Sequence, residues 1–153
     1  MNLTAHFTLD EMLKSQTALR MGLDNSPEPD QLDSLLALCE NVLEPIRVHW
    51  AKPVVVNSGF RALPVNRAIG SKDSSQHVRG EAADIEIPGV DNLELYYWIA
   101  QELDFDQLIL EFYSGEPSSG WVHVSYVGDD NRNQTLRIDK GGVTRETLPQ
   151  RVA

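Results

Sequence analysis

Three short segments of alternating polarity restrict the fold of this chain most strongly. They span residues 82–87, 107–112 and 121–126. Successive side chains of a β-strand point to opposite faces of a sheet, so each segment is predicted to be a strand with one apolar face. The predicted apolar sets are Ala83, Ile85 and Ile87; Leu108, Leu110 and Phe112; and Val122, Val124 and Tyr126. The other faces carry Asp84, Glu111 and His123, which share one side if the strands pair in a single sheet.

Helical patterns flank these strands. Thr8 and Glu11 have the spacing of a capping box, which predicts a short helix through about Lys14. A longer helix is predicted after Pro29, and Pro45 is expected to kink or loosen its last turn. Its apolar positions recur at helical spacing: Leu32, Leu35, Leu36, Cys39, Val42, Leu43 and Ile46.

Two further elements complete the expected architecture. Residues 54–56 form a β-branched run and are predicted to be a strand, and residues 93–103 are predicted to be a helix. The core face of that helix is expected to hold Leu93, Tyr96, Tyr97, Ile99 and Ala100. Helices covering the apolar face of the sheet would leave the reactive face open, which is an α+β layer architecture with a site on the uncovered side.

The length of 153 residues favours one domain, residues 1–153. Its core is expected over about residues 1–128, and residues 129–153 are expected to be a C-terminal extension. In that extension a loop precedes a possible edge strand at residues 135–139.

Charge and composition exclude several classes of protein. The net charge is −10, so a basic surface for nucleic acid or anionic lipid is not expected. No apolar run approaches the ~18 residues of a membrane span, so no membrane insertion is expected. Residues 1–9 do not resemble a signal peptide, which predicts synthesis in the cytoplasm. The single cysteine, Cys39, lies on an apolar helical stripe and is interpreted as a buried thiol. The oligomeric state is not predicted.

A metal site is the most specific chemical hypothesis. His77 and Asp84 stand seven residues apart, and His123 lies in the segment WVHVS. Two imidazoles and one carboxylate could hold a Zn²⁺ ion and leave a position for water, as in catalytic zinc sites. Hydrolysis would then require a general base and a group that stabilises negative charge on the substrate, for which Glu111 and Arg61 are the candidates. Taken alone, His123 could equally be a core histidine, and Arg61 could be a turn residue.

The motif Ser75-x-His77-x-x-Gly80-x-Ala82-x-Asp84 resembles that of the M15 peptidases, a family of D-Ala-D-Ala carboxypeptidases and phage L-alanyl-D-glutamate endopeptidases. The segments SGFR at 58–61, NRA at 66–68 and WVHVS at 121–125 follow in the expected order. The resemblance covers about residues 1–128. It implies a Hedgehog/DD-peptidase fold, in which an antiparallel sheet has helices on one face and zinc on the other.

The resemblance also implies roles for individual residues. His77, Asp84 and His123 are expected to bind one Zn²⁺ ion per chain. Arg61 is expected to contact substrate, and Ser75 to form a hydrogen bond beside the ligands. The implied substrate is the peptide stem of bacterial peptidoglycan.

One position departs from the family pattern. Several relatives carry an acidic general base three residues before the second zinc histidine, and this chain has Gly120 there. The candidates to replace it are Glu111, on the preceding predicted strand, and Glu116, in the following loop. Glu111 is preferred because a strand positions a catalytic group better than a loop rich in glycine and serine.

Two functional classes follow. The first is a zinc peptidase that acts on peptidoglycan, as a carboxypeptidase or as an endopeptidase of the endolysin type. Its action at the cell wall would require holin-type release or delivery in a virion. The second is a non-catalytic relative that keeps zinc for stability or for binding a partner.

Overall fold

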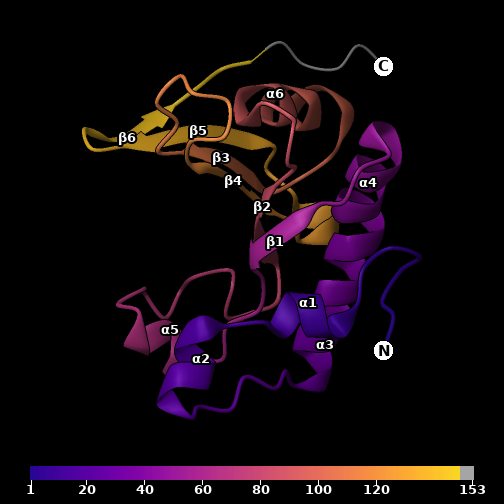
Figure 1. Cartoon of the computed structure of the whole chain (residues 1–153), viewed down its shortest axis with the longest axis vertical. Coiled ribbons are helices and arrows are strands. Elements are labelled where there is room, and N and C mark those ends of the chain that lie inside the picture. Colours follow the sequence, from indigo (N-terminus) through magenta and orange to yellow (C-terminus); the bar gives the residue numbers. More distant parts are fainter. Residues whose placement is uncertain (149–153) are drawn as a thin grey trace.

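A computed structural model provides the fold, and it describes residues 1–148. Residues 149–153, the end of the predicted C-terminal extension, lie outside the described residues. Six strands form one sheet in the order β1-β2-β4-β3-β5-β6. In Figure 1 helices lie above the sheet, to its right and below it.

The N-terminal helices follow the predicted capping signals. Helix α1 (Leu9–Leu13) begins after Thr8, whose hydroxyl accepts a hydrogen bond from the Glu11 amide while the Glu11 carboxylate accepts one from the Thr8 amide. The predicted short helix is therefore confirmed. Helix α2 (Gln16–Met21) was not predicted, although Ser15 caps it in the same way.

The long predicted helix is confirmed and contains an irregular turn. Helix α3 (Pro29–Leu38) continues through a π-helical turn (Cys39–Leu43) into helix α4 (Glu44–Trp50). Pro45 has no amide hydrogen and crowds the preceding turn, so the helix widens just before it. Cys39 is fully buried in this turn, and burial raises the pKa of its thiol to about 12.

The sheet consists of β1 (Val55–Ser58), β2 (Ala82–Glu86), β3 (Gln107–Glu111), β4 (Trp121–Ser125), β5 (Gln134–Asp139) and β6 (Gly142–Arg145). The predicted antiparallel sheet is wrong in one respect, because β3 and β5 run parallel. After β4 the chain passes the start of β3 and returns along its far side, which makes β5 parallel to β3. The sheet is therefore mixed.

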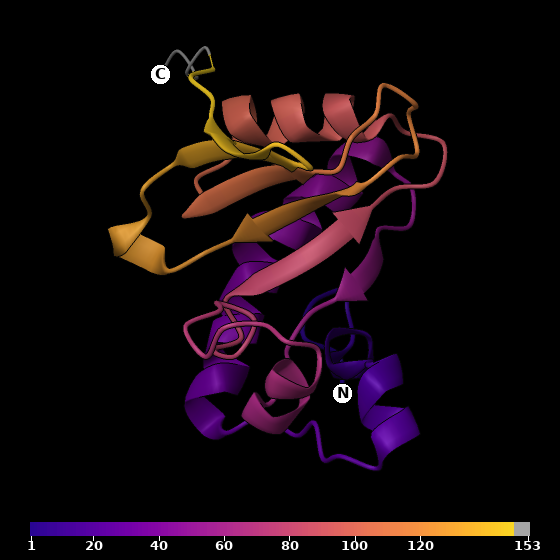
Figure 2. The same ribbon diagram turned by 90° about the vertical axis from the view of Figure 1, so that its left-hand side faces the viewer.

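The two faces of the sheet differ in chemistry. Buried apolar residues of β2, β3 and β4 belong to the core together with residues of the helices. Figure 2 looks onto the sheet with α3 and α4 behind it. The opposite face, here called the open face, carries Asp84, His123 and Glu111, three of the residues that line a cleft. The register confirms that these three share one side, since His123 pairs with Asp84 and Trp121 with Glu111.

Phe112 was assigned to the apolar face, and this prediction is wrong. The strand β3 ends at Glu111, and Phe112 adopts a left-handed backbone with φ of 56°. The alternation of side chains ends there, so the ring is 46% exposed and contacts the ring of Trp121 on the open face.

Helix α6 (Asn92–Glu102) packs on the covered face of the sheet, close to its predicted range. Its core side chains include Leu95, Tyr96 and Ile99, whereas Tyr97 is 37% exposed. The inclusion of Tyr97 in the core face is therefore wrong, and Leu95 was missed. Helix α5 (Leu63–Ala68), which precedes the loop to β2, was not predicted.

The C-terminal strands extend the same sheet. The predicted strand at residues 135–139 exists as β5, but it is not an edge strand, because β6 pairs along its outer side. Among residues 1–148, no helix combines the length and the apolar character needed to cross a membrane.

A buried carboxylate joins β3, the loop before β2 and the C-terminal segment. Asp106 is 3% exposed and accepts hydrogen bonds from Gln76 Nε2 at 2.7 Å and from Arg132 Nε and Nη2 at 2.9 and 2.8 Å. Hydrogen bonds from Arg132 lower the pKa of Asp106 to about 2, against the effect of burial. This network holds Gln76, the residue directly before His77.

We expect Asp106→Asn to lower the free energy of unfolding at pH 7 by about 2 kcal/mol, because it removes a carboxylate that holds charge-assisted hydrogen bonds. The folded-state pKa lies below the unfolded value of about 3.9, so this contribution is complete above pH ~4 and falls away toward pH ~2. Urea unfolding of both proteins between pH 7 and 3 should show a difference that shrinks below pH ~4. The exposed Asp129→Asn is the control. A difference independent of pH would contradict this account.

Candidate metal centre

Three side chains converge at the base of the open face. Asp84 lies on β2 and pairs in register with His123 on β4, while His77 lies in the loop before β2. One nitrogen from each histidine and one carboxylate oxygen lie within 4.8 Å of one another. The predicted ligand residues are therefore brought together, by a strand pairing and one loop.

The loop that carries His77 is fastened to α3. Gln31 Nε2 donates a hydrogen bond to the Val78 carbonyl at 3.1 Å. Gly80 has a φ of 74°, and a Cβ atom there would lie 2.5 Å from the Gln31 carbonyl oxygen. Glycine at this position therefore allows the loop to approach the helix closely.

His77 is oriented by a backbone contact. Its Nδ1 lies 2.7 Å from the Gly59 carbonyl oxygen. A carbonyl oxygen only accepts, so Nδ1 carries the hydrogen, and burial lowers the pKa of His77 and favours the neutral ring. The lone pair on Nε2 then faces Asp84 Oδ1 at 3.4 Å. Two acceptors at that distance repel each other unless a cation or a proton lies between them.

Asp84 remains ionised in spite of its surroundings. Burial alone would raise its pKa, but the hydrogen bond with His123 holds the pKa of this carboxyl well below its usual range. His123 Nδ1 lies 2.9 Å from Asp84 Oδ1. The centre thus combines one buried negative charge with two imidazole rings.

This donor set fits zinc. Zinc–nitrogen and zinc–oxygen bonds of about 2.0–2.1 Å at tetrahedral angles place neighbouring ligand atoms about 3.3 Å apart. The separations from Asp84 Oδ1 to His77 Nε2 and His123 Nδ1 are 3.4 and 2.9 Å. A further ligand position on the cleft side would be available to water, as catalytic zinc requires.

Arg61 is held beside this centre by neutral groups. Its Nε donates to Asn66 Oδ1 at 3.1 Å, and its terminal nitrogens donate to Ser58 Oγ and Ser75 Oγ at 3.3 and 3.4 Å. Within residues 1–148 no carboxylate forms an ion pair with this guanidinium. Its charge therefore remains available for a bound anion.

Ser75 lies between Arg61 and His77. Its hydroxyl oxygen also accepts a hydrogen bond from the His77 amide at 3.3 Å. The side chain thus connects the guanidinium to the loop of the ligand cluster.

A cleft of ≈ 390 Å³ opens above the cluster. Arg61, Glu111, Trp121 and the three clustered residues all line it. Glu111 Oε2 accepts a hydrogen bond from Trp121 Nε1 at 2.9 Å, which fixes the carboxylate in the cleft. Burial, with a smaller effect of the charge on Asp84, raises the pKa of Glu111. A carboxylate of raised basicity beside a cation site is suited to taking up a proton.

Position 120, three residues before His123, has no room for a side chain. Gly120 has a φ of 62°, and a Cβ atom would lie 1.9 Å from the Glu111 carbonyl oxygen. Glu116 lies exposed in the loop before it and does not line the cleft. Of the two carboxylates considered from the sequence, only Glu111 faces the cluster.

Several residues of this site escaped the sequence analysis. Strand alternation places Trp121 on the same face as His123, but it did not predict the hydrogen bond by which Trp121 orients Glu111. Ser58 and Asn66 hold Arg61 from separate elements, and no sequence spacing indicates that contact.

An α+β protein with a His-Asp-His cluster in an open cleft has the features of a mononuclear metal-dependent hydrolase. The Peptidase M15 family model matches residues 5–125. The chain therefore belongs to the peptidase M15 family, whose members are zinc-dependent peptidases. No curated protein matches the chain. The family match ends with β4, so β5 and β6 lie outside it.

We expect zinc to stabilise the folded protein by about 2.7 kcal/mol at a free concentration one hundred times its dissociation constant. Calorimetric titration should give one zinc ion per chain, and thermal unfolding should shift upward with zinc. His77→Ala and His123→Ala should each abolish the shift, whereas His49→Ala, which lies outside the cluster, should retain it. An undiminished shift in both cluster variants would contradict the site.

We also expect Gly120→Ala to lower the free energy of unfolding by about 2 kcal/mol or more, because the new methyl group overlaps backbone. Gly22→Ala is a matched control, since Gly22 has a φ of 65° and nothing lies within 4 Å of the position that its new methyl group would take. Denaturant unfolding gives the free energy lost in each variant. The difference between the two losses is the cost of the steric overlap, because both variants share the cost of a left-handed backbone at alanine. Equal losses of unfolding free energy in Gly120→Ala and Gly22→Ala would contradict this prediction, because they would show that the backbone shifts to accommodate the methyl group at no cost.

Proposed function

We propose that this protein is a zinc peptidase that hydrolyses peptide bonds in the peptide stem of bacterial peptidoglycan. The observation that carries the proposal is the combination, in one cleft, of the His77-Asp84-His123 cluster, Glu111 and Arg61, which forms no ion pair with an acidic side chain of residues 1–148. Family membership supports the peptidase chemistry. The cell-wall substrate and the carboxypeptidase or endopeptidase type are parts of the proposal.

The residues have distinct roles in this proposal. His77, Asp84 and His123 hold the zinc ion, which when bound would acidify a water molecule and polarise the scissile carbonyl. Glu111 takes up the proton of the attacking water and delivers it to the leaving amine. Trp121 keeps the Glu111 carboxylate turned into the cleft through its indole hydrogen bond.

Arg61 is assigned to substrate recognition. Burial lowers the pKa of Arg61, and the nearby Asp84 and Glu111 act in the opposite direction, so the guanidinium keeps its charge. Three neutral partners orient it. A planar cation fixed in this way suits a substrate carboxylate or the oxygen of the scissile carbonyl. Ser75 is one of the groups that position the Arg61 guanidinium.

The alternative is a non-catalytic zinc protein. Such a protein would need the ligand cluster but would have no use for a half-buried carboxylate of raised basicity turned toward it. The orientation of Glu111 therefore favours the enzyme.

Glu111→Gln is expected to lower kcat by about 10²–10⁴-fold, since the amide keeps the shape of the side chain but cannot take up a proton. Zinc content should be unchanged. Glu116→Gln, in the neighbouring loop, is the matched control and should retain activity. Full activity of zinc-loaded Glu111→Gln would remove Glu111 from the mechanism.

The proposal itself is tested by mass spectrometry of soluble peptidoglycan fragments incubated with the zinc-loaded protein. New products, absent after treatment with a chelator and restored by zinc, are the expected result, and their masses identify the bond. Fragments of several stem types that all remain intact would favour the non-catalytic alternative.

A further inference from the structure

The open face continues beyond the family match onto β5 and β6. In β5, Arg137 contacts Tyr97 of α6 and therefore lies on the covered side. Its neighbours Leu136 and Ile138 point the other way, and the register places Leu136 beside Ile109 and Ile138 beside Glu111. Pairing with β6 adds Arg145 next to Leu136 and Val143 next to Ile138. One row of side chains thus runs from His123 through Ile109 and Leu136 to Arg145.

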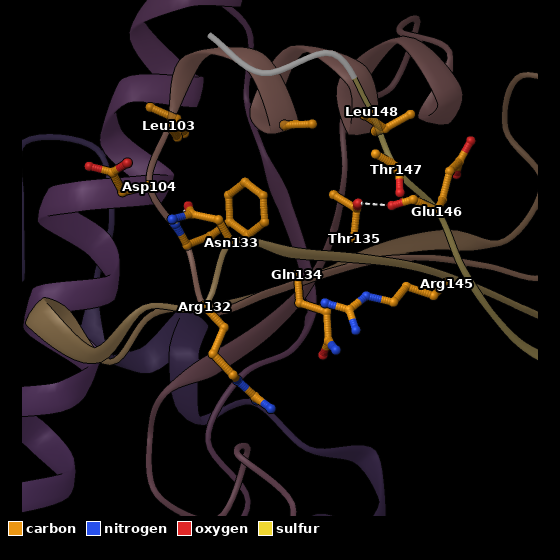
Figure 3. Close-up of a pocket in the computed structure, with 12 residues that line it drawn as sticks. Leu103, Asp104, Arg132, Asn133, Gln134, Thr135, Arg145, Glu146, Thr147 and Leu148 are labelled. Atoms are coloured by element: carbon orange, nitrogen blue, oxygen red, sulfur yellow. Dashed lines mark hydrogen bonds between the residues drawn. The ribbon is translucent and has the colours of Figure 1, made fainter. Parts of the chain in front are cut away.

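A second hollow lies at the far end of this row, where β5 and β6 meet the end of α6. It has a volume of ≈ 330 Å³, and its lining includes Arg132, Gln134 and Arg145. In Figure 3 these three side chains extend to the side of the sheet opposite the helix that ends near Leu103. Gln134 Oε1 accepts a hydrogen bond from Gln107 Nε2 at 2.7 Å, and Gln107 lines the metal cleft. This pair of glutamines thus links the lining of one hollow to the lining of the other.

Arg145 differs from the other arginines of the C-terminal segment. Arg132 is paired with Asp106, and Arg137 with Glu146. Arg145 is exposed, and no acidic side chain within residues 1–148 forms an ion pair with it. The row therefore has an apolar middle, formed by Ile109 and Leu136, and a cation at its far end.

Resting on the proposed function, we propose that β5 and β6 form a second substrate-binding site, in which Arg145 binds a free carboxylate of the peptide that the metal centre cleaves. Three strand spacings of about 4.8 Å separate β4 from β6, or about 14 Å in total. An extended peptide advances about 3.3–3.6 Å per residue, so the carboxylate lies about four residues from the scissile bond. Leu136 provides an apolar surface for the intervening residues.

The negative net charge of the protein gives the exposed guanidinium of Arg145 a particular importance for binding an acidic peptide. The chain carries a net charge of −10, which repels an acidic peptide in general. A guanidinium at the end of the row, with Arg61 at the cleft, gives such a peptide two cationic contacts along one line. The spacing between them would select for substrate length as well as charge.

The test combines two protein variants with a set of stem peptides in which one carboxylate at a time is replaced by a carboxamide. Arg145→Gln is compared with Lys140→Gln, which removes the same charge from the turn between the same two strands. Arg145→Gln should raise KM by about five- to tenfold with kcat and zinc content unchanged. Lys140→Gln should behave like the parent protein.

The peptides then identify the group that Arg145 binds. In the parent protein, one distal carboxamide should raise KM by a similar factor, and in Arg145→Gln the same carboxamide should have no further effect. The inference is overturned if every carboxamide acts equally in both proteins, or if the two variants behave alike. Failure of the parent protein to cleave the unmodified peptides would overturn the proposed function, and the inference with it.

Discussion

The buried carboxylate of Asp84 is the constraint on which the rest of the site depends. An ionised group in this position requires positive or hydrogen-bonding partners, and His123 Nδ1 lies 2.9 Å from Asp84 Oδ1. His77 Nε2 lies 3.4 Å from the same oxygen. The Gly59 carbonyl fixes the tautomer of one imidazole, which leaves a lone pair facing the carboxylate. A divalent cation between the lone pair and the carboxylate would remove the repulsion between them. The surrounding strands and loops hold His77, Asp84 and His123 in place around that position.

The sheet accounts for most of this placement. Pairing of β2 with β4 brings Asp84 beside His123, and pairing of β3 with β4 brings Glu111 beside Trp121 on the same face. His77 and Arg61 instead come from loops, which are fastened by Gln31, Asn66 and Asp106. Two of the three clustered residues and Glu111 thus lie on strands, while His77 and Arg61 lie on loops that other elements hold.

Strand alternation, which depends only on local backbone geometry, predicted that Asp84, Glu111 and His123 would share a face if their strands paired in one sheet, and the pairing of β2 and β3 with β4 fulfils that condition. It failed at Phe112, where a left-handed residue ends the pattern, and it could not predict that β5 runs parallel to β3. The direction of β5 depends on the path of the connection after β4, which no local pattern encodes. The three hydrogen bonds that orient Arg61 come from partners on β1, on α5 and in the loop before β2, and only the folded chain shows that these elements meet at the guanidinium.

The central claim is that His77, Asp84 and His123 form one zinc site in the cleft. Anomalous diffraction at the zinc edge from crystals of the zinc-loaded protein tests it most directly. The account predicts one strong peak within bonding distance of all three side chains, on the side of the cleft that Glu111 and Arg61 line. A peak elsewhere, or none in crystals grown with excess zinc, would contradict it.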